Sequence, residues 1–193
     1  MLVNNEHKDI TLLKLMQAGD RLAYKELINR HKDYAFTVAF RILNNREDAE
    51  EVAQDAFLQV YKHITDFNYE SKFTTWFYRI VFNAALMQKR KNRVFTEDIE
   101  TSTQAMMVSA QADTTEQIRS RERSKAIQQA LQNLSSDDAL LITLFYLKEQ
   151  TLEEIAEILT ISAETAKVKL FRARKRLADE MKKKLKDEVR SLL

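Results

Sequence analysis

Cationic residues are concentrated in one segment near the C-terminal end of the sequence. Between Glu164 and Asp179 there are six Lys and Arg residues and no acidic residue. On a helix, the side opposite the apolar face would carry Thr165, Val168, Arg172, Lys175 and Arg176, flanked by Lys167, Lys169 and Phe171. Such a helix suits the major groove of DNA, where residues near the N-terminus reach base edges and later cations reach phosphates. A solvated amphipathic helix is the alternative, although solvated faces usually alternate in charge.

A second basic segment without acidic residues lies in the middle of the chain. Residues 71–96 contain Lys72, Arg79, Lys89, Arg90, Lys91 and Arg93, and aromatic residues are interleaved with them from Phe67 to Phe82. Rings beside cations form a stacking surface for unpaired bases, each stack contributing roughly 1–3 kcal/mol. Ordinary core packing is the alternative for Trp76, Phe77 and Ile80. Core packing is the weaker explanation for Phe67, Asn68 and Tyr69, which we expect in a loop.

An acidic segment precedes the aromatic one, with Glu47, Asp48, Glu50, Glu51 and Asp55 within nine residues. Such a face repels DNA. It is either a plain solvated helix or a docking surface for a basic protein partner.

Residues for catalysis, cofactors or metals are not arranged in any known pattern. There is no Cys, which excludes disulfides, thiolate metal sites and a thiol nucleophile. His7, His31 and His63 are scattered, and the single Gly19 excludes glycine-rich phosphate loops. We therefore expect no enzyme activity, no cofactor and no metal.

The composition indicates the fold class. One Gly and no Pro in 193 residues argue against sandwiches, barrels and doubly wound sheets, which need many tight turns, so an all-α protein is expected. No apolar run approaches the roughly 20 residues of a membrane span, and no signal peptide is recognisable. These features predict a cytoplasmic protein without membrane insertion. The net charge is only +2, so nucleic-acid affinity would have to come from charge distribution.

Apolar spacing divides the chain into two helical parts. In the first part, helices are expected at 10–16, 20–43, 47–64 and 73–93, with a loop at 65–72. Residues 94–117 lose this spacing and hold five acidic residues and no base, which predicts a flexible acidic linker. We thus expect small domains at 1–93 and 118–193. Within the second, residues 152–177 have helix-turn-helix spacing, and Thr151 with Glu154 matches a capping box.

Three blocks in this order resemble the bacterial sigma factors of the extracytoplasmic-function group in the sigma-70 family. They are EDAEEVAQDAF at 47–57, FTTWFYRIVFN at 73–83, and EIA at 154–156 with FRARKRL at 171–177. The resemblance extends from about Gly19 to Leu177. It implies a factor that binds the core of RNA polymerase and directs promoter-specific initiation, performs no covalent chemistry and is commonly controlled by an anti-sigma factor.

The resemblance also implies roles for individual residues. Contacts with core polymerase would come from Asp48, Glu51, Gln54 and Asp55. The minus-ten element would be read by a pocket for a flipped base formed by Phe67, Asn68, Ile80 and Asn83, while Lys89, Arg90, Lys91 and Arg93 hold the backbone. The minus-thirty-five element would be read by Lys167, Val168, Phe171 and Arg172. The linker would thread a basic channel of the polymerase.

Two other functions fit the same residues less fully. An ordinary helix-turn-helix regulator would bind an operator tightly by itself, usually as a dimer. A structural helical adaptor would bind neither DNA nor polymerase, and the two basic segments argue against it.

The sequence also departs from the family at Thr160, where Gly is frequent, and at Glu164 and Ala166. If Thr160 is left-handed, it costs roughly 1 kcal/mol or more.

Overall fold

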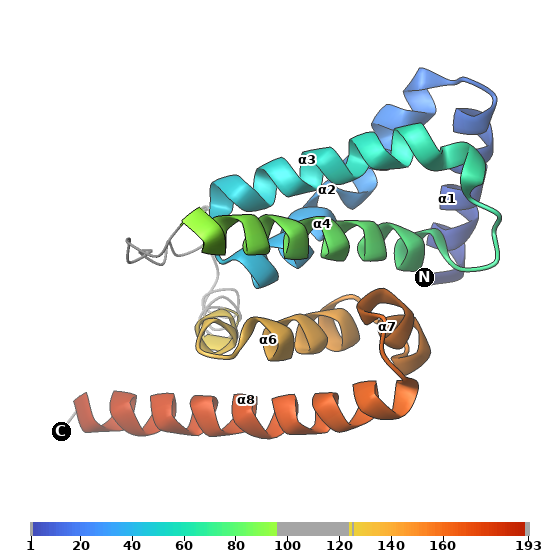
Figure 1. Ribbon diagram of the computed structural model, residues 1–193. Helices are drawn as coiled ribbons and strands as arrows, with labels where there is room; N and C mark the ends of the chain where they lie inside the picture. Colours follow the sequence, from blue (N-terminus) through green and yellow to red (C-terminus); the bar gives the residue numbers. More distant parts are fainter. Residues whose placement is uncertain (1, 96–123, 125, 192–193) are drawn as a thin grey trace, which may run out of the picture.

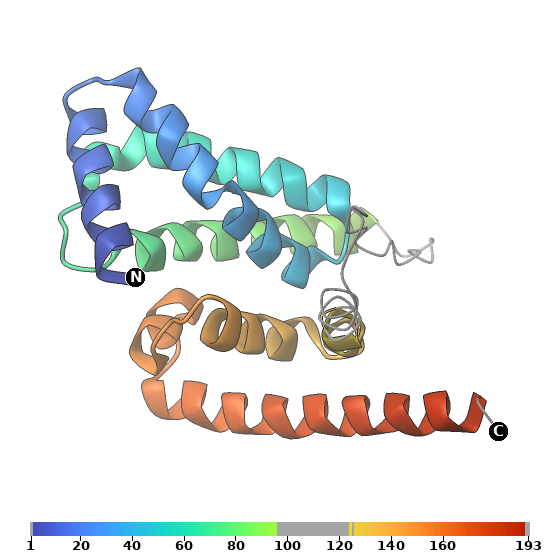
Figure 2. The same cartoon turned by 180° about the vertical axis from the view of Figure 1, so that it is seen from behind.

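The computed structural model describes residues 2–95, 124 and 126–191, and its regular structure there is entirely helical. The N-terminal lobe, residues 2–95, consists of α1 (Leu2–Gln17), α2 (Arg21–Leu43), α3 (Arg46–His63), the 3₁₀ turn η1 (Ile64–Asp66) and α4 (Phe73–Phe95). The C-terminal lobe, residues 126–191, contains a helical segment at 126–132, α6 (Ser136–Ile142), the π-helical turn η2 (Thr143–Leu147), α7 (Leu152–Leu159) and α8 (Ala163–Ser191). Figures 1 and 2 show both lobes from opposite sides. The all-α prediction is confirmed.

Polar residues at helix ends separate α1, α2 and α3. Gly19 has a φ of 91° in the turn after α1, and the Asp20 carboxylate accepts hydrogen bonds from the backbone N–H groups of Leu22 and Ala23. Asn44 ends α2 in a left-handed conformation with a φ of 53°, and the side chain of Asn45 caps α3. These residues satisfy backbone groups that helix ends leave without partners.

The core of the N-terminal lobe lies where α2, α3 and α4 meet. Val38, Val60, Phe77 and Val81 are fully buried, and the Phe77 ring packs 4.7 Å from that of Phe57 between centroids. Burying each such side chain stabilises the fold by about 1.5–3 kcal/mol. This core fixes the direction of α4 and of the loop before it.

The C-terminal lobe has the predicted helix-turn-helix geometry. Thr151 and Glu154 form the reciprocal capping box at the start of α7. Thr160 follows α7 with a φ of 55°, so the left-handed turn considered from the sequence is present. On α8, Ala166, Leu170 and Ala173 are buried against the preceding helices.

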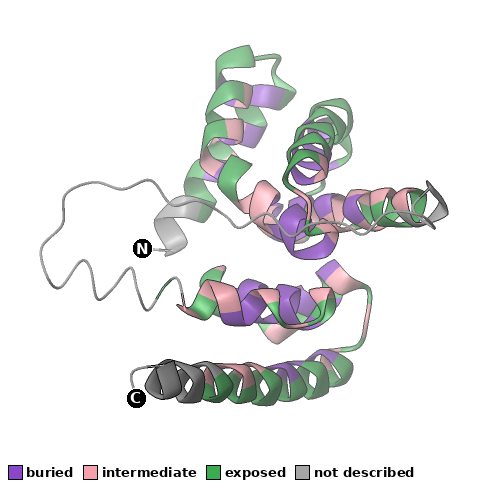
Figure 3. Ribbon diagram, turned by 90° about the vertical axis from the view of Figure 1, so that its left-hand side faces the viewer, coloured by how far each residue is buried: buried purple, intermediate pink, exposed green. Residues whose placement is uncertain are grey.

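The two lobes pack against each other, which the sequence did not predict. Contacts of α4 with α7 and of α2 with α6 join them, and one continuous cluster of buried apolar residues runs through both. Figure 3 shows the buried positions where the layers meet and exposed ones on the outer surface of α8. Residues 94–95 of the predicted linker belong to α4, and the remainder of the linker lies outside the described residues.

Some local expectations need correction. The first helix begins at Leu2 rather than near residue 10, and the last extends to Ser191. Leu22 shares the apolar spacing of α2 but is 77% exposed, whereas Ala23 beside it is buried.

Candidate nucleic-acid interface

The outward face of α8 carries the side chains predicted to read duplex DNA. Ser162 accepts a hydrogen bond from the backbone N–H of Thr165 at 3.1 Å, and the two hydroxyl oxygens lie 2.9 Å apart, so Thr165 takes part in the helix cap. Phe171 is 68% exposed and Val168 is 49% exposed. The other exposed members of this face are Thr165, Lys167, Lys169, Arg172, Lys175 and Arg176. The helix therefore presents cations and one large ring to solvent.

Arg176 differs from the other predicted members of that face. Its guanidinium Nη1 donates to the Asp138 carboxylate of α6 at 2.5 Å, and the Asp138 side chain is only 8% exposed. This partly buried pair fastens α8 to α6, so Arg176 has a structural contact that the sequence did not reveal. Arg174 lies over the rings of Phe145 and Tyr146, at 5.3 and 5.2 Å from their centroids.

The loop before α4 contains one buried ring and one exposed amide. Phe67 is 5% exposed and packs against Trp76, with 5.1 Å between ring centroids, and against Tyr69 at 4.9 Å. The expectation that Phe67 avoids the core is therefore wrong, because the rings that follow it fold back over the loop. Asn68 is exposed, and its side-chain oxygen accepts a hydrogen bond from the N–H of Glu70. Tyr69 has a φ of 63°.

The remaining predicted residues of the minus-ten surface follow one another along α4. Ile80 is half-buried, and Asn83 is exposed. Lys89, Arg90 and Lys91 are exposed near the C-terminal end of the helix. Arg93 belongs to α4, but its side chain lies outside the described residues.

The acidic face of α3 is exposed except at Asp48. Glu51, Gln54 and Asp55 are exposed on α3. The Asp48 carboxylate instead accepts a hydrogen bond from Nδ2 of Asn92 at 2.8 Å, and it is half-buried. Asp48 thus ties α3 to α4, whereas the other three residues are available to a partner.

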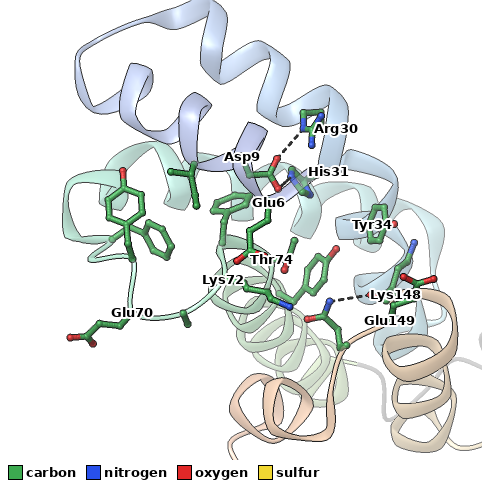
Figure 4. Close-up of a pocket in the computed structure, with 17 residues that line it drawn as sticks. Glu6, Asp9, Arg30, His31, Tyr34, Glu70, Lys72, Thr74, Lys148 and Glu149 are labelled. Atoms are coloured by element: carbon green, nitrogen blue, oxygen red, sulfur yellow. Dashed lines mark hydrogen bonds and ion pairs between the residues drawn. The ribbon is translucent and has the colours of Figure 1, made fainter. Parts of the chain in front are cut away.

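A cavity of about 480 Å³ lies at the junction of α1, α2, the 67–72 loop and the 148–150 turn (Figure 4). In its wall, the Asp9 carboxylate lies 2.9 Å from Nε of Arg30 and 3.1 Å from Nε2 of His31. The Lys148 ammonium lies 3.2 Å from the centroid of the Tyr34 ring, and burial lowers the pKa of Lys148 to about 8.

Acidic and basic side chains are mixed in this cavity. The acidic members are Glu6, Asp9, Glu70 and Glu149, and the basic ones are Arg30, Lys72 and Lys148, with His31. Since the four carboxylates outnumber the Lys and Arg side chains, the cavity does not favour a polyanion in the way that the outward face of α8 does.

Sequence reasoning missed Arg41 in α2. This residue is 7% exposed at the interface between the lobes, and it lies in the uninterrupted buried run 38–42. A helix segment that is apolar on all sides is typically covered on all sides. The apolar residues around Arg41 were therefore a signal that a second layer packs on this end of α2.

Two absences concern the described part of the chain only. No group of three or more potential metal-binding side chains occurs there. None of the helices described is long and apolar enough to cross a bilayer.

Comparisons with known proteins match both lobes. Sigma-70 region 2 matches residues 27–94, and Sigma-70, region 4 matches residues 124–177. The ECF RNA polymerase sigma factor SigW of Bacillus subtilis (strain 168) is 32% identical over 177 residues, covering 88% of this chain and 95% of the relative. SigM of Mycobacterium tuberculosis (strain ATCC 25618 / H37Rv) is 30% identical over 175 residues, covering 90% and 85%.

Solved structures show the same fold. The sigma factor RpoE in complex with the anti-sigma factor NepR from Bartonella quintana has a TM-score of 0.65 at 22% identity, covering 82% of this chain and 96% of that one. CnrH, in complex with the cytosolic domain of CnrY, has a TM-score of 0.63 at 20% identity, covering 89% and 96%.

Proposed function

The chain belongs to the extracytoplasmic-function sigma factors of the sigma-70 family, which bind the core of RNA polymerase and direct promoter-specific initiation, and we propose how its surfaces divide that work. Residues 1–93 serve core binding and the minus-ten element, and residues 118–193 serve the minus-thirty-five element, with 94–117 between them. The observation that carries this division is the outward face of α8, whose cations and exposed Phe171 point away from the protein core.

The upstream element is read by α8. Lys167, Val168, Phe171 and Arg172 reach base edges or the thymine methyl group, and Thr165 and Lys169 contact the backbone. The Arg176 side chain is 59% exposed, but its Nη1 already donates to Asp138, so we assign it the smallest share of phosphate binding.

The downstream element is read by α4 and the loop before it. Asn68 and Asn83 supply exposed amides for a flipped base, and half-buried Ile80 supplies an apolar wall. Phe67 is buried and holds the loop against the core. Lys89, Arg90, Lys91 and Arg93 hold the phosphate backbone. Flipping costs a few kcal/mol of unstacking, which stacking and hydrogen bonds in such a site offset.

The polymerase contact is made by the acidic face of α3. Glu51, Gln54 and Asp55 are exposed and meet a basic surface of the core enzyme, while Asp48 positions α3 against α4. Complementary charge of this kind increases the rate of association and selects the partner.

An anti-sigma factor is the expected regulator, since the sigma factor RpoE, which has the same fold, is bound to the anti-sigma factor NepR in its solved structure. The site of action is the cytoplasm, where the polymerase and the chromosome meet.

In vitro transcription with core polymerase tests the assignments. Arg172→Ala should reduce transcription from a promoter with its upstream element intact, and Lys182→Ala, which removes an exposed cation farther along α8, is the matched control. Equal loss of transcription on a template with a scrambled upstream element would contradict the role of α8.

Charge reversal at Glu51 or Asp55 should weaken core association in a pull-down while leaving the circular dichroism spectrum unchanged. Unchanged pull-down would place the docking surface elsewhere.

A further inference from the structure

The cavity at the junction of the two lobes holds polar groups that neither the DNA-reading faces nor the docking face uses (Figure 4). Its volume of about 480 Å³ falls within the range of about 300–1,000 Å³ that is usual for small-molecule sites, which occur preferentially between domains. One wall comes from α1, α2, the 67–72 loop and the start of α4, and the other comes from the 148–150 turn. Among the residues that line it, none belongs to the outward face of α8 or to the acidic face of α3.

Gln150 contributes a buried acceptor to this cavity. The residue is 8% exposed, and within the described part of the chain its side-chain oxygen Oε1 has no hydrogen-bond partner. The orientation of the amide is fixed because Nε2 donates to the carbonyl of Lys148 at 3.1 Å, so Oε1 is the atom that lacks a partner. Leaving a buried acceptor without a partner is unfavourable, and a ligand that donates a hydrogen bond to Oε1 removes that penalty.

His31 is a second buried residue of the wall whose hydrogen-bonding capacity is not used. It is 6% exposed, and neither ring nitrogen has a hydrogen-bond partner among the described residues, although Nε2 lies 3.1 Å from Oδ2 of Asp9. In the neutral ring one nitrogen donates and the other accepts. The carboxylate beside Nε2 favours the proton on that nitrogen, so Nδ1 is the acceptor. Gln150 and His31 thus both offer an acceptor, which selects a ligand that donates.

The charges of the wall favour a cationic ligand. The Arg30 guanidinium is matched by Asp9 at 2.9 Å, and Nζ of Lys72 is matched at 2.7 Å by Glu154, which lies outside the lining. Three exposed carboxylates of the lining have no ion pair within 4 Å among the described residues, those of Glu6, Glu70 and Glu149. An excess of carboxylates at the wall attracts cations and repels anions.

Aromatic rings line the same space and already hold one cation. Nζ of Lys148 lies 3.2 Å from the centroid of the Tyr34 ring, which is stacked on Tyr78 with 6.0 Å between centroids. Ring faces of this kind attract alkylammonium groups. The Lys148 charge opposes a cationic ligand, but burial lowers the pKa of Lys148 to about 8, so part of the protein lacks this charge near neutral pH. Further rings complete the wall, those of Phe67, Tyr69 and Phe73.

We propose that this cavity binds a small diammonium compound, an unbranched alkyl chain with two primary amino groups, whose N–H groups donate to Gln150 and to the carboxylates of Glu6 and Glu149. The alkyl chain lies against the aromatic rings. Two charges fit because acceptors stand on both lobes, with Glu6 on α1 and with Glu149 and Gln150 on the 148–150 turn. The amino groups are primary because a quaternary ammonium has no N–H to donate to Gln150. The inference does not depend on the proposed function.

Titration of the full chain with cadaverine, read by isothermal calorimetry, tests the proposal. Fluorescence gives a second readout, because Trp76 is the single Trp and its ring lies 5.1 Å from that of Phe67 and 6.1 Å from that of Phe73 between centroids. We expect saturable binding at one site. Pentanediol has the same length without charge, and the bis-trimethylammonium analogue of cadaverine has the charge without N–H groups. Both should bind at least about tenfold more weakly than cadaverine.

Three variants locate the bound diamine. Gln150→Leu removes the buried acceptor at similar volume and should weaken cadaverine binding about tenfold or more. Glu149→Gln removes one exposed charge of the wall and should weaken binding about twofold to fivefold. Glu153→Gln is the matched control, because it removes an equally exposed charge four residues farther along, outside the cavity, and should bind like the unmodified chain. Circular dichroism checks that all three variants keep their helix content.

Any of three results overturns the proposal. Absence of saturable binding by the unmodified chain at millimolar cadaverine would show that the cavity is not a diamine site. Equal affinity of Gln150→Leu and Glu153→Gln would place the diamine elsewhere on the acidic surface. Equal affinity of cadaverine and its bis-trimethylammonium analogue would show that charge alone is recognised. If Gln150→Leu loses helix content, Glu149→Gln takes its place, and equal affinity of Glu149→Gln and Glu153→Gln then refutes the site.

Discussion

The Arg41→Met substitution tests what a buried cation contributes to the interface between the lobes. Nε of Arg41 donates to Oγ1 of Thr143 at 3.2 Å, and Nη2 donates to Oε1 of Gln128 at 2.5 Å. Neither partner is charged, and among the described residues no carboxylate is recorded in an ion pair with Arg41. Because the buried guanidinium loses hydration and no carboxylate compensates for that loss, the pKa of Arg41 is lowered.

The magnitude follows from opposing contributions. Removing a charge from water costs several kcal/mol, and each hydrogen bond from a charged donor returns about 1.5–3 kcal/mol. The cost of desolvation and the gain from the two hydrogen bonds therefore nearly cancel. In Arg41→Met the Thr143 hydroxyl still donates to the carbonyl of Ala139 at 2.7 Å, and half-buried Gln128 can bond to water. We therefore expect the free energy of unfolding to stay unchanged or to rise by about 1–4 kcal/mol.

Urea denaturation followed by circular dichroism measures this change, provided that the slope of the transition is the same in both proteins. Arg41→Ala is the matched variant, because it removes the packing as well as the charge, and it should be less stable than Arg41→Met by about 2 kcal/mol or more. A loss of more than about 2 kcal/mol in Arg41→Met would refute the reasoning, since the two hydrogen bonds would then outweigh desolvation.

Three further predictions concern single side chains. The pKa of Lys148 is lowered to about 8 from an ordinary 10.5, so the unfolded chain binds more protons between these values. The free energy of unfolding should therefore rise from about pH 8 to about pH 10, and the rise should be smaller in Lys148→Met. Thr160→Gly relieves a left-handed φ of 55°, and a gain of about 1 kcal/mol would raise the thermal midpoint by about 2–4 °C, measured by calorimetry. Phe171→Ala removes a ring that is 68% exposed, so stability should change by no more than about 0.5 kcal/mol while transcription from a promoter with an intact upstream element falls.

Most of the helical architecture could be predicted because it depends on local signals. The predicted capping box of Thr151 with Glu154 is present, and Asp20, Asn44 and Asn45, residue types that favour helix ends, lie at the boundaries of α2 and α3. These signals act through the nearest few residues, so they do not depend on the rest of the chain. The outward face of α8 follows from spacing in the same way.

The predictions that were wrong or incomplete involve contacts between residues from different elements of the fold. Phe67 is buried because Trp76, nine residues later, folds back over it, and no local pattern contains that contact. Arg176 is cationic and at an outward helical position, yet Asp138 from another helix holds it. The sequence predicts which residues are charged and on which side of a helix they lie. It does not predict whether the opposite charge comes from DNA or from another part of the chain.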